Sequence, residues 1–323
     1  MEYQVEAALA FALLGSKTPV KLVRSREDDI RGGYYRPMAM HRARIGLKGA
    51  KIIGWDHRIA CKPIIKGTAF ESKEVKKGGI DPVSVEGVND THYAIPDMSV
   101  GLADATTPVP VLWWRSVGHT HTAYAMETLM DMAAAAVKQD PVAFRLSYLA
   151  GGDKDQQRLA GVLKLATDKA GWGKAVAGHY RGVAVHKSFN SYVAEVAEIS
   201  LQGGKVRIEK ITCAVDCGIA VNPDVIRAQM EGGIGYGLGA IMRNEVTMTD
   251  GEVDQGNFTD YEPIRMADMP AIDVHIVPST APPTGVGEPG TPPAGPALAN
   301  AIFAVTGKRI TRLPMTADGI EFA

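Results

Sequence analysis

The chain has 323 residues, of which 46% are hydrophobic and 22% are charged, a composition typical of globular proteins. Its 35 lysines and arginines are balanced by 36 aspartates and glutamates, which leaves a net charge of -1. This balance argues against nucleic acid as a partner and against binding to a membrane surface, because both attract an excess of positive charge.

Membrane insertion, export and disulfide bonding are also disfavoured. No apolar run approaches the roughly 18 residues of a membrane-spanning helix, and residues 1–4 lack the cationic start of a signal peptide. We therefore expect no direct membrane insertion, and a location that is cytoplasmic or, through a signal-bearing partner, periplasmic. Cys61, Cys213 and Cys217 are too few for a disulfide framework or a four-cysteine metal site, so we expect them to be small buried residues.

The first half of the chain is predicted to mix helices and strands. Apolar residues recur at the three-to-four spacing of a helix over residues 5–13, before Gly15 ends the pattern. Asp140 followed by Pro141 indicates the start of another helix. The remaining expected elements are a strand over 20–23, paired strands over 43–47 and 52–60, long loops with short elements over 62–110, and a helix over 120–138.

The second half is predicted to contain a hairpin and two further helices. The sequence Gln-Gly-Gly at 202–204 indicates a tight turn between two strands. Thr291 is expected to cap a helix that tolerates prolines in its first turn and ends at Gly307. The expected elements are strands over 182–185, 192–201, 205–215, 245–248 and 272–277, and helices over 222–239 and 291–307.

The fold class follows from the order of these elements. Strands and helices mix without a regular βαβ alternation, which favours an α+β fold. At about 150 residues per domain the length predicts two domains, and the glycine-rich stretch within 150–180 is the weakest for packing. We therefore expect domains over 1–160 and 161–323.

The most unusual segment is residues 284–293, in which Glu288 lies among three glycines and three prolines. Glycines let the backbone approach a ligand closely, and prolines limit the conformational freedom of that backbone. The carboxylate of Glu288 is therefore predicted to be held in place rather than mobile. A fixed carboxylate suits proton abstraction. The alternative is a solvated glutamate in a turn, where acids are common.

A second candidate segment covers residues 113–121, with two tryptophans, an arginine and two histidines. Arg115 and backbone N–H groups at a helix start could bind an anion, although the tryptophans could equally be core residues. His119 and His121 lack a nearby third ligand, so hydrogen bonding is favoured over metal binding.

A third candidate is the helix over 222–239, which carries five glycines, each costing about 1 kcal/mol relative to alanine. Something must approach its backbone closely, and tight helix packing and a ligand site are comparable explanations. Dinucleotide and P-loop motifs are absent from the sequence, as are the serine nucleophile elbow, the H-E-x-x-H motif and the EF-hand loop.

These segments, in this order, resemble the molybdenum hydroxylase superfamily, and within it the molybdopterin-binding subunit of the isoquinoline 1-oxidoreductase type. The likeness runs from about residue 4 to residue 315. Its most specific parts are residues 26–29, 35–37, 114–119, 213–218, 229–233, 285–290 and 307–309.

The resemblance implies hydroxylation of an aldehyde or an N-heteroaromatic ring with oxygen from water. It also implies two mixed α/β subdomains of the molybdopterin-binding type, with the cofactor site between them and a partner chain. In this family a glutamate in the place of Glu288 is the catalytic base, and the protein supplies no direct metal ligand. Carried over by position, Arg115, Ser116, Gly118, Gln229 and Gly287 would contact the cofactor, while Trp114, Val117 and His119 would line the substrate pocket.

Two departures limit the resemblance. Val117 stands where xanthine dehydrogenases place an aromatic residue that stacks on substrate, which puts purine binding in doubt. The family's Gly-Gly-Gly-Phe-Gly loop and Met-Gly-Gln-Gly segment do not occur in this sequence. The chain thus resembles only the C-terminal part of the subunit, and a complete cofactor site would need a chain that carries the N-terminal part.

The cofactor implied is molybdenum held by molybdopterin, in the cytosine dinucleotide form. Electrons would leave through a small partner subunit with 2Fe-2S clusters, because three cysteines cannot hold one. The rival hypothesis is a non-catalytic assembly or binding subunit that retains the fold. A hydrolase that activates water with Glu288 is a third hypothesis, but no electrophile is visible.

Overall fold

The computed structural model describes residues 2–323, and the chain forms two compact units. The smaller unit combines the segment that ends at Gly33 with Glu245–Glu262, and the larger unit holds Tyr34–Asn244 and Pro263–Ala323. The domain boundary expected near residue 160 is a different division and stays a prediction. Among residues 2–323, no helix has the length and apolar character that crossing a bilayer requires.

The smaller unit contains helices α1 (Glu2–Leu13) and α2 (Arg26–Arg31) and the short antiparallel strands β7 (Met248–Thr249) and β8 (Glu252–Val253). Helix α1 confirms the prediction for residues 5–13. The strand predicted over 20–23 is wrong, because that segment has no regular structure and no partner strand to pair with. Of the strand predicted over 245–248, only Met248 lies in β7.

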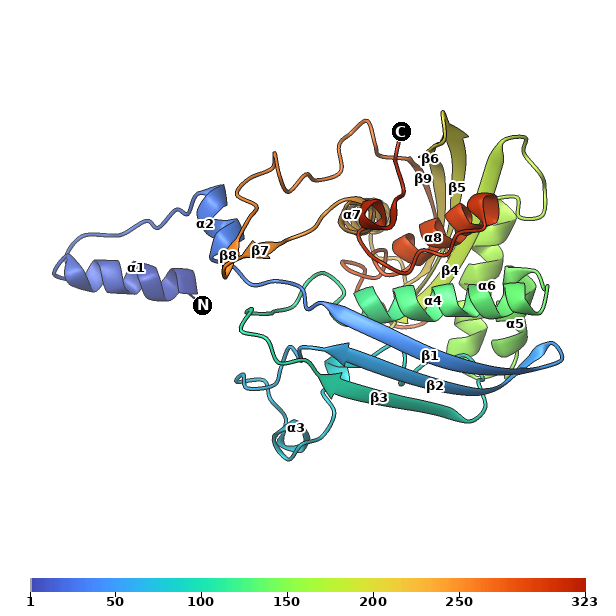
Figure 1. The fold of residues 1–323 in the computed structure, drawn as a ribbon, viewed down its shortest axis with the longest axis horizontal. Helices are drawn as coiled ribbons and strands as arrows, with labels where there is room; N and C mark the ends of the chain where they lie inside the picture. The colour runs from blue at the N-terminus through green and yellow to red at the C-terminus, as the bar shows by residue number, and fades with distance from the viewer. Residues whose placement is uncertain (1) are drawn as a thin grey trace. The chain divides into compact units, whose positions relative to one another are not determined.

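The first sheet of the larger unit has three strands (Figure 1). Strands β1 (Ala39–Lys48) and β2 (Lys51–Cys61) form the predicted antiparallel pair, and β3 (Met98–Asp104), which the sequence does not predict, runs parallel to β2. The long irregular region after β2 holds only α3 (Lys73–Lys76) and the short 3-10 helix at Pro82–Ser84 before β3 begins.

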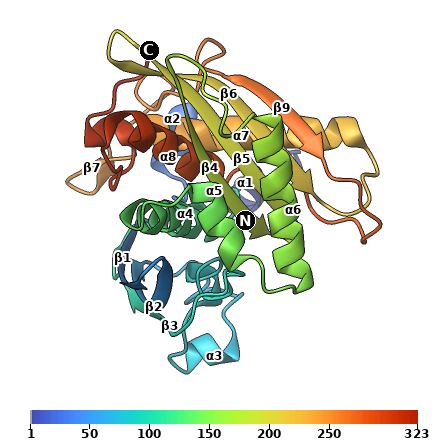
Figure 2. The same cartoon turned by 90° about the vertical axis from the view of Figure 1, so that its right-hand side faces the viewer.

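The second sheet has the order β4-β5-β6-β9 and is covered by helices on both faces (Figure 2). Helix α6 (Lys154–Lys169) packs on one face, while α7 (Pro223–Met242) and α8 (Ala294–Thr306) pack on the other. Buried residues alternate along the strands, so that neighbours such as Val183 and Ala184 enter opposite cores. The strands are β4 (His179–Ser188), β5 (Ser191–Gln202), β6 (Lys205–Asp216) and β9 (Ala271–Ile276).

Helix α4 (His119–Ala136) lies against both β1 and α8, so it joins the two sheets (Figure 1). It confirms the helix predicted over 120–138. The cap predicted at Thr291 is wrong: α8 begins at Ala294, and the Thr291 hydroxyl instead donates to the carbonyl of Gly233, 3.1 Å away. The mixture of two sheets with flanking helices confirms the α+β class.

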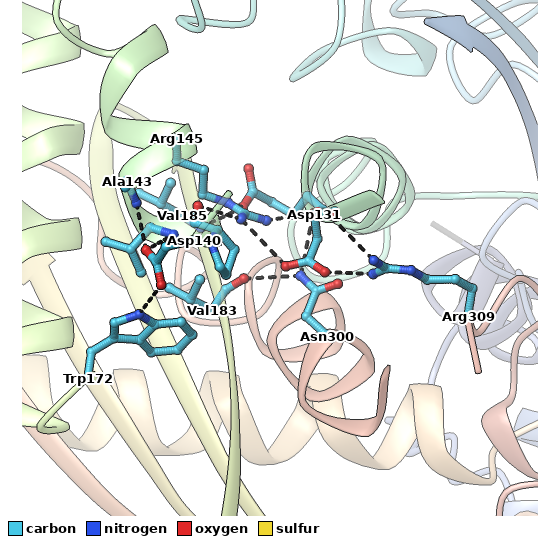
Figure 3. Close-up of polar contacts among 12 residues, drawn as sticks. Asp131, Asp140, Ala143, Arg145, Trp172, Val183, Val185, Asn300 and Arg309 are labelled. Carbon is cyan, nitrogen blue, oxygen red and sulfur yellow. Dashed lines mark hydrogen bonds and ion pairs between the residues drawn. The ribbon is translucent and has the colours of Figure 1, made fainter. Parts of the chain in front are cut away.

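A buried ion-pair network fixes α4 against α5 (Pro141–Tyr148) and the chain after α8 (Figure 3). Arg145 Nε donates to Glu127 Oε2 at 2.8 Å, and both side chains are almost fully buried. The same Glu127 oxygen accepts a hydrogen bond from the backbone N–H of Val185 in β4. Asp131, one turn further along α4, pairs with Arg309 at 2.6 Å. Helix α4, which begins within the candidate segment 113–121, is therefore held by buried ion pairs as well as by apolar packing.

Replacing Arg145 by methionine is expected to destabilise the protein by about 3–5 kcal/mol, because the carboxyl group of Glu127 would be left buried without its ion-pair partner. Urea unfolding at neutral pH measures this. Arg227→Met, which removes an arginine from an exposed pair with Asp224, is the matched control and should change stability by less than about 1 kcal/mol. A similar small change for Arg145→Met would show that the buried pair does not hold α4.

Glu195 lies at the centre of β5 and is completely buried. Neither of its carboxylate oxygens has a hydrogen-bond partner in the described part of the chain. Burial raises the pKa of this carboxyl group well above its ordinary value, so the folded protein keeps the group protonated where the unfolded chain ionises it.

The contribution of Glu195 to stability is therefore expected to be most favourable below about pH 4.3, the ordinary pKa of glutamate, and to become less favourable as pH rises above it. Glu195→Leu should remove this dependence and add about 1–3 kcal/mol at neutral pH, because the unpaired polar atoms disappear. Unfolding curves at several pH values test both effects. An unchanged slope with pH in the variant would contradict the assignment to Glu195.

Candidate active site

The chain enters α4 through residues 116–118, here called the entrance segment. Ser116 and Val117 have φ values of 78° and 51°, in the left-handed region that branched residues such as valine rarely adopt. The N–H of Val117 closes the turn on the carbonyl of Trp114 at 2.7 Å. Such strain persists only where surrounding contacts fix the backbone, and two carboxylates supply such contacts here.

The first carboxylate is Glu288, which lies 172 residues away in sequence from Ser116. The N–H of Ser116 donates to Glu288 Oε1 at 3.0 Å, and the Ser116 hydroxyl donates to the Glu288 carbonyl at 2.7 Å. The loop is also tied at Gly285, whose carbonyl accepts from the Ser191 hydroxyl at 2.7 Å. Glu288 is half-buried, and its carboxylate has a defined position, unlike that of a solvated turn residue.

Arg115 joins the loop of Glu288 to helix α7. Its Nε donates to the Gly287 carbonyl at 2.7 Å, and its Nη2 reaches the side-chain oxygen of Gln229 at 3.2 Å. The structure thus brings together Arg115, Ser116, Gln229, Gly287 and Glu288, five residues that the sequence singles out. The sequence suggested that the Arg115 guanidinium could bind an anion, but two of its nitrogens already donate hydrogen bonds within the protein.

Glycines in α7 allow the loop after Glu288 to pack directly on the helix backbone. A Cβ atom at Gly237 would lie 2.9 Å from the carbonyl oxygen of Thr291, too close for any larger residue without displacement. A Cβ atom at Gly233 would lie 3.3 Å from the carbonyl carbon of Gly290, which is also a tight contact. Close packing therefore accounts for these two glycines, one of the two explanations that the sequence left open.

The two tryptophans before Arg115 have different surroundings. Trp114 stacks on Tyr236 of α7 with ring centroids 4.6 Å apart, and the Arg36 guanidinium lies over its ring at 5.0 Å. Trp113 is 44% exposed, so it is not a core residue. Val117 packs against a small apolar cluster formed by Ile64, Ile65 and Val75.

The second carboxylate is Glu86, which the sequence does not single out. Its Oε1 accepts a hydrogen bond from the Gly118 N–H at 2.8 Å, and its Oε2 lies 3.6 Å from His119 Nε2. His119 Nδ1 is hydrogen-bonded to His186 Nε2 at 2.9 Å, and burial lowers the pKa of His119 to about 4. These three side chains line a cavity of about 300 Å³, together with Phe189.

His121 belongs to a separate buried chain of imidazoles. Its Nδ1 lies 2.8 Å from His41 Nε2, and His41 Nδ1 lies 2.9 Å from His57 Nε2. The Trp55 indole N–H donates to His57 Nδ1 at 3.2 Å. Because an indole only donates, His57 must carry its proton on Nε2, and the same logic places the proton of His41 on Nε2. The hydrogen-bonding interpretation of both His119 and His121 is confirmed.

Two family models, each described as a molybdopterin cofactor-binding domain, match residues 1–149 and 120–270. The chain belongs to the molybdenum hydroxylase family. The resemblance derived from the sequence motifs is therefore confirmed.

Two curated relatives of this molybdenum hydroxylase chain align with nearly all of it. It is 31% identical to the membrane-bound aldehyde dehydrogenase [pyrroloquinoline-quinone] of Gluconacetobacter polyoxogenes, over 97% of this chain and 44% of the relative. It is also 31% identical to isoquinoline 1-oxidoreductase subunit beta of Brevundimonas diminuta, over 96% of this chain and 40% of the relative. The chain thus spans about two fifths of the length of these relatives.

Solved structures show the same fold at low sequence identity. Quinoline 2-oxidoreductase from Pseudomonas putida 86 superposes with a TM-score of 0.77 at 14% identity, over 97% of this chain and 65% of that one. The CO dehydrogenase of Oligotropha carboxidovorans gives a TM-score of 0.78 at 11% identity, over 96% and 64%. The mixed α/β architecture is thus that of molybdenum hydroxylases.

The side chains at the junction of Arg115, Gln229 and Glu288 fit a molybdopterin cofactor. Gln229 Oε1 accepts from Arg115, while its Nε2 has no acceptor among residues 2–323. Glu288 Oε2 likewise has no hydrogen-bond donor in the described structure. A pterin offers ring nitrogens and a carbonyl as acceptors, so an amide donor without a protein acceptor is chemically suited to it.

Proposed function

We propose that this chain is the C-terminal part of the molybdenum subunit of an oxidoreductase that hydroxylates an aldehyde or an N-heteroaromatic compound with oxygen from water. The observation that carries the proposal is the fixed carboxylate of Glu288, held by Ser116 beside Arg115 and Gln229. The names of the two relatives, an aldehyde dehydrogenase and an isoquinoline oxidoreductase, support these two substrate classes.

Glu288 is the catalytic base in this proposal. The Ser116 N–H holds Oε1, so Oε2 is the atom that accepts the proton from the oxygen nucleophile as it adds to the substrate carbon. A positioned base of this kind contributes about 10²–10⁴-fold to a rate. When bound, the molybdenum cofactor supplies the two-electron oxidation.

The other site residues hold the cofactor or shape the pocket. The Gln229 amide donates to the cofactor, Arg115 fixes Gln229 and Gly287 in place, and the backbones of Ser116 and Gly118 set the position of the entrance segment. Trp114, Val117 and His119 line the substrate pocket. The small aliphatic side chain of Val117 cannot stack on a purine, which favours substrates other than xanthine.

The proposed partners are a chain, or a chain region, equivalent to the N-terminal part of the relatives, and a small subunit with 2Fe-2S clusters. The proposed cofactor form is molybdopterin cytosine dinucleotide. Within residues 2–323 no group of three or more potential ligands is placed to hold a metal ion. In this proposal the pterin carries the metal.

The experiment is to purify the native complex that contains this chain and to measure its molybdenum, iron and released nucleotide. Because one relative is named for pyrroloquinoline quinone, the extract is also analysed for quinone. Dye reduction is then assayed with aldehydes and with N-heterocycles. Stoichiometric molybdenum and turnover support the proposal; molybdenum without turnover favours a binding subunit, and quinone without molybdenum refutes it.

A further inference from the structure

Carboxylates hold both ends of the entrance segment. At one end Glu288 Oε1 accepts from the Ser116 N–H at 3.0 Å, and at the other Glu86 Oε1 accepts from the Gly118 N–H at 2.8 Å. Two residues in this segment, Ser116 and Val117, have left-handed backbone. Ser116 itself donates the first of these hydrogen bonds, and Gly118, directly after Val117, donates the second. A loss of either hydrogen bond would therefore free a strained backbone to relax.

The segment that carries Glu86 lies directly against Gly118. A Cβ atom at Gly118 would lie 1.8 Å from the carbonyl oxygen of Val83 and 3.0 Å from Cγ of Glu86. Only glycine allows this approach. Because the backbones are this close, a small shift of Glu86 moves Gly118 as well.

The surroundings of Glu86 disfavour the negative charge of its own carboxylate. Burial, with a further contribution from Asp90, raises the pKa of Glu86 to about 7, although the Gly118 N–H opposes the rise. His119, 3.6 Å away, is neutral at that pH, since burial lowers its pKa to about 4. The titratable or charged groups around Glu86 and its cavity are Asp81, Asp90 and His92 on the same stretch of chain, His119 and Glu127 on α4, and His186 and Lys187 on β4.

The charged neighbours on the facing elements already have partners. Glu127 is paired with Arg145, and Lys187 with Asp155 at 3.1 Å. Burial keeps His186 neutral, because it lowers its pKa well below the ordinary value. In the described structure these elements supply no unpaired cation to hold Glu86 in its charged form, so its contact with the Gly118 N–H changes with its own protonation.

We propose that Glu86 is a positioning residue whose ionised form fixes the entrance segment, and with it the contact between Ser116 and Glu288, so that protonation of Glu86 loosens the segment. A carboxylate accepts a hydrogen bond more strongly than a carboxylic acid does. The effect on the segment is a property of this chain alone. Its consequence for catalysis rests on the proposed function.

Hydrogen exchange of the Gly118 amide tests the first part without any assay of activity. In the full chain, or in its native complex, protection corrected for intrinsic exchange is expected to rise about tenfold between pH 6 and pH 8.5, the difference between a neutral and a charged acceptor. Glu86→Gln keeps an acceptor oxygen but cannot ionise, so its profile should be flat. Asp90→Asn, a second variant in the same cavity, should keep the rise but move its midpoint to lower pH, because Asp90 helps to raise the pKa of Glu86.

A wild-type profile that does not change with pH would overturn the proposal, whether or not the variant folds. The same rise in Glu86→Gln as in wild type would also overturn it. In the active complex, kcat/KM of wild type should show an acid limb near pH 7 that Glu86→Gln lacks, with most of the change in kcat. An expected exchange profile in a complex without turnover would refute the proposed function and leave the role of Glu86 standing.

Discussion

Glu288→Gln is expected to lower kcat/KM of the assembled enzyme by about 10²–10⁴-fold, the range for loss of a positioned general base. Glutamine is nearly the same size, and its side-chain oxygen can still accept the hydrogen bond that Ser116 N–H gives to Oε1. The variant therefore keeps the loop in place and loses only the ability to accept a proton. Steady-state kinetics of the purified complex, at saturating dye, measure the effect.

Molybdenum content separates loss of the base from loss of the cofactor. It should stay at the wild-type level in Glu288→Gln, because the contacts of Arg115 with Gln229 and Gly287 are untouched. Glu252→Gln, a change at an exposed acid in β8, is the matched control and should retain full activity. Near-normal turnover by Glu288→Gln with normal metal would rule out this carboxylate as the base.

The buried imidazoles of His41, His57 and His121 predict a steep loss of stability in acid. Burial, the largest cause for each, lowers their pKa values to about 2, about 4 and about 3. In the unfolded chain each has its ordinary value near 6.5. The unfolded state therefore binds more protons below that pH, and stability that is full above about pH 6.5 is lost as pH falls toward the folded values.

From pH 7 to pH 5 the loss should amount to about 2 kcal/mol for each histidine. Urea unfolding at the two pH values measures the total. His41→Asn changes the middle one of these three imidazoles. It should make stability depend less on pH, even if it also lowers stability overall. His275→Asn, at a half-buried histidine outside this group of three, is the control variant. The same dependence on pH in His41→Asn as in the wild type would show that this imidazole titrates normally.

Local patterns in the sequence were enough to predict much of the fold. The apolar spacing before Lys138, the Gln-Gly-Gly turn at 202–204 and the Asn-Pro-Asp sequence that opens the helix predicted over 222–239 all act within a few residues. Helix α4, the β5–β6 hairpin and α7 follow from them. Helix α6 is missing from the prediction although Asp153 caps it and Leu159, Val162 and Leu163 have helical spacing. The cap and the apolar spacing together would have predicted this helix.

The site could be predicted only in part, because its contacts join distant segments. The sequence singled out Ser116 and Glu288 separately, but no pattern shows that residues 172 positions apart meet. Glu86 and His186 had no local signal at all, since each acquires its role from a neighbour brought near by the fold. Burial, which sets their pKa values, is likewise a property of the assembled core.

The close packing of α7 on the residues after Glu288 has a mechanical consequence. Backbone meets backbone at Gly237 and Thr291, with no flexible side chain between them to absorb a displacement. The backbones that carry Gln229 and Glu288 are therefore expected to move together. A motion of these two segments is expected to change the distance of both residues from the rest of the protein, while the spacing between their two backbones changes little.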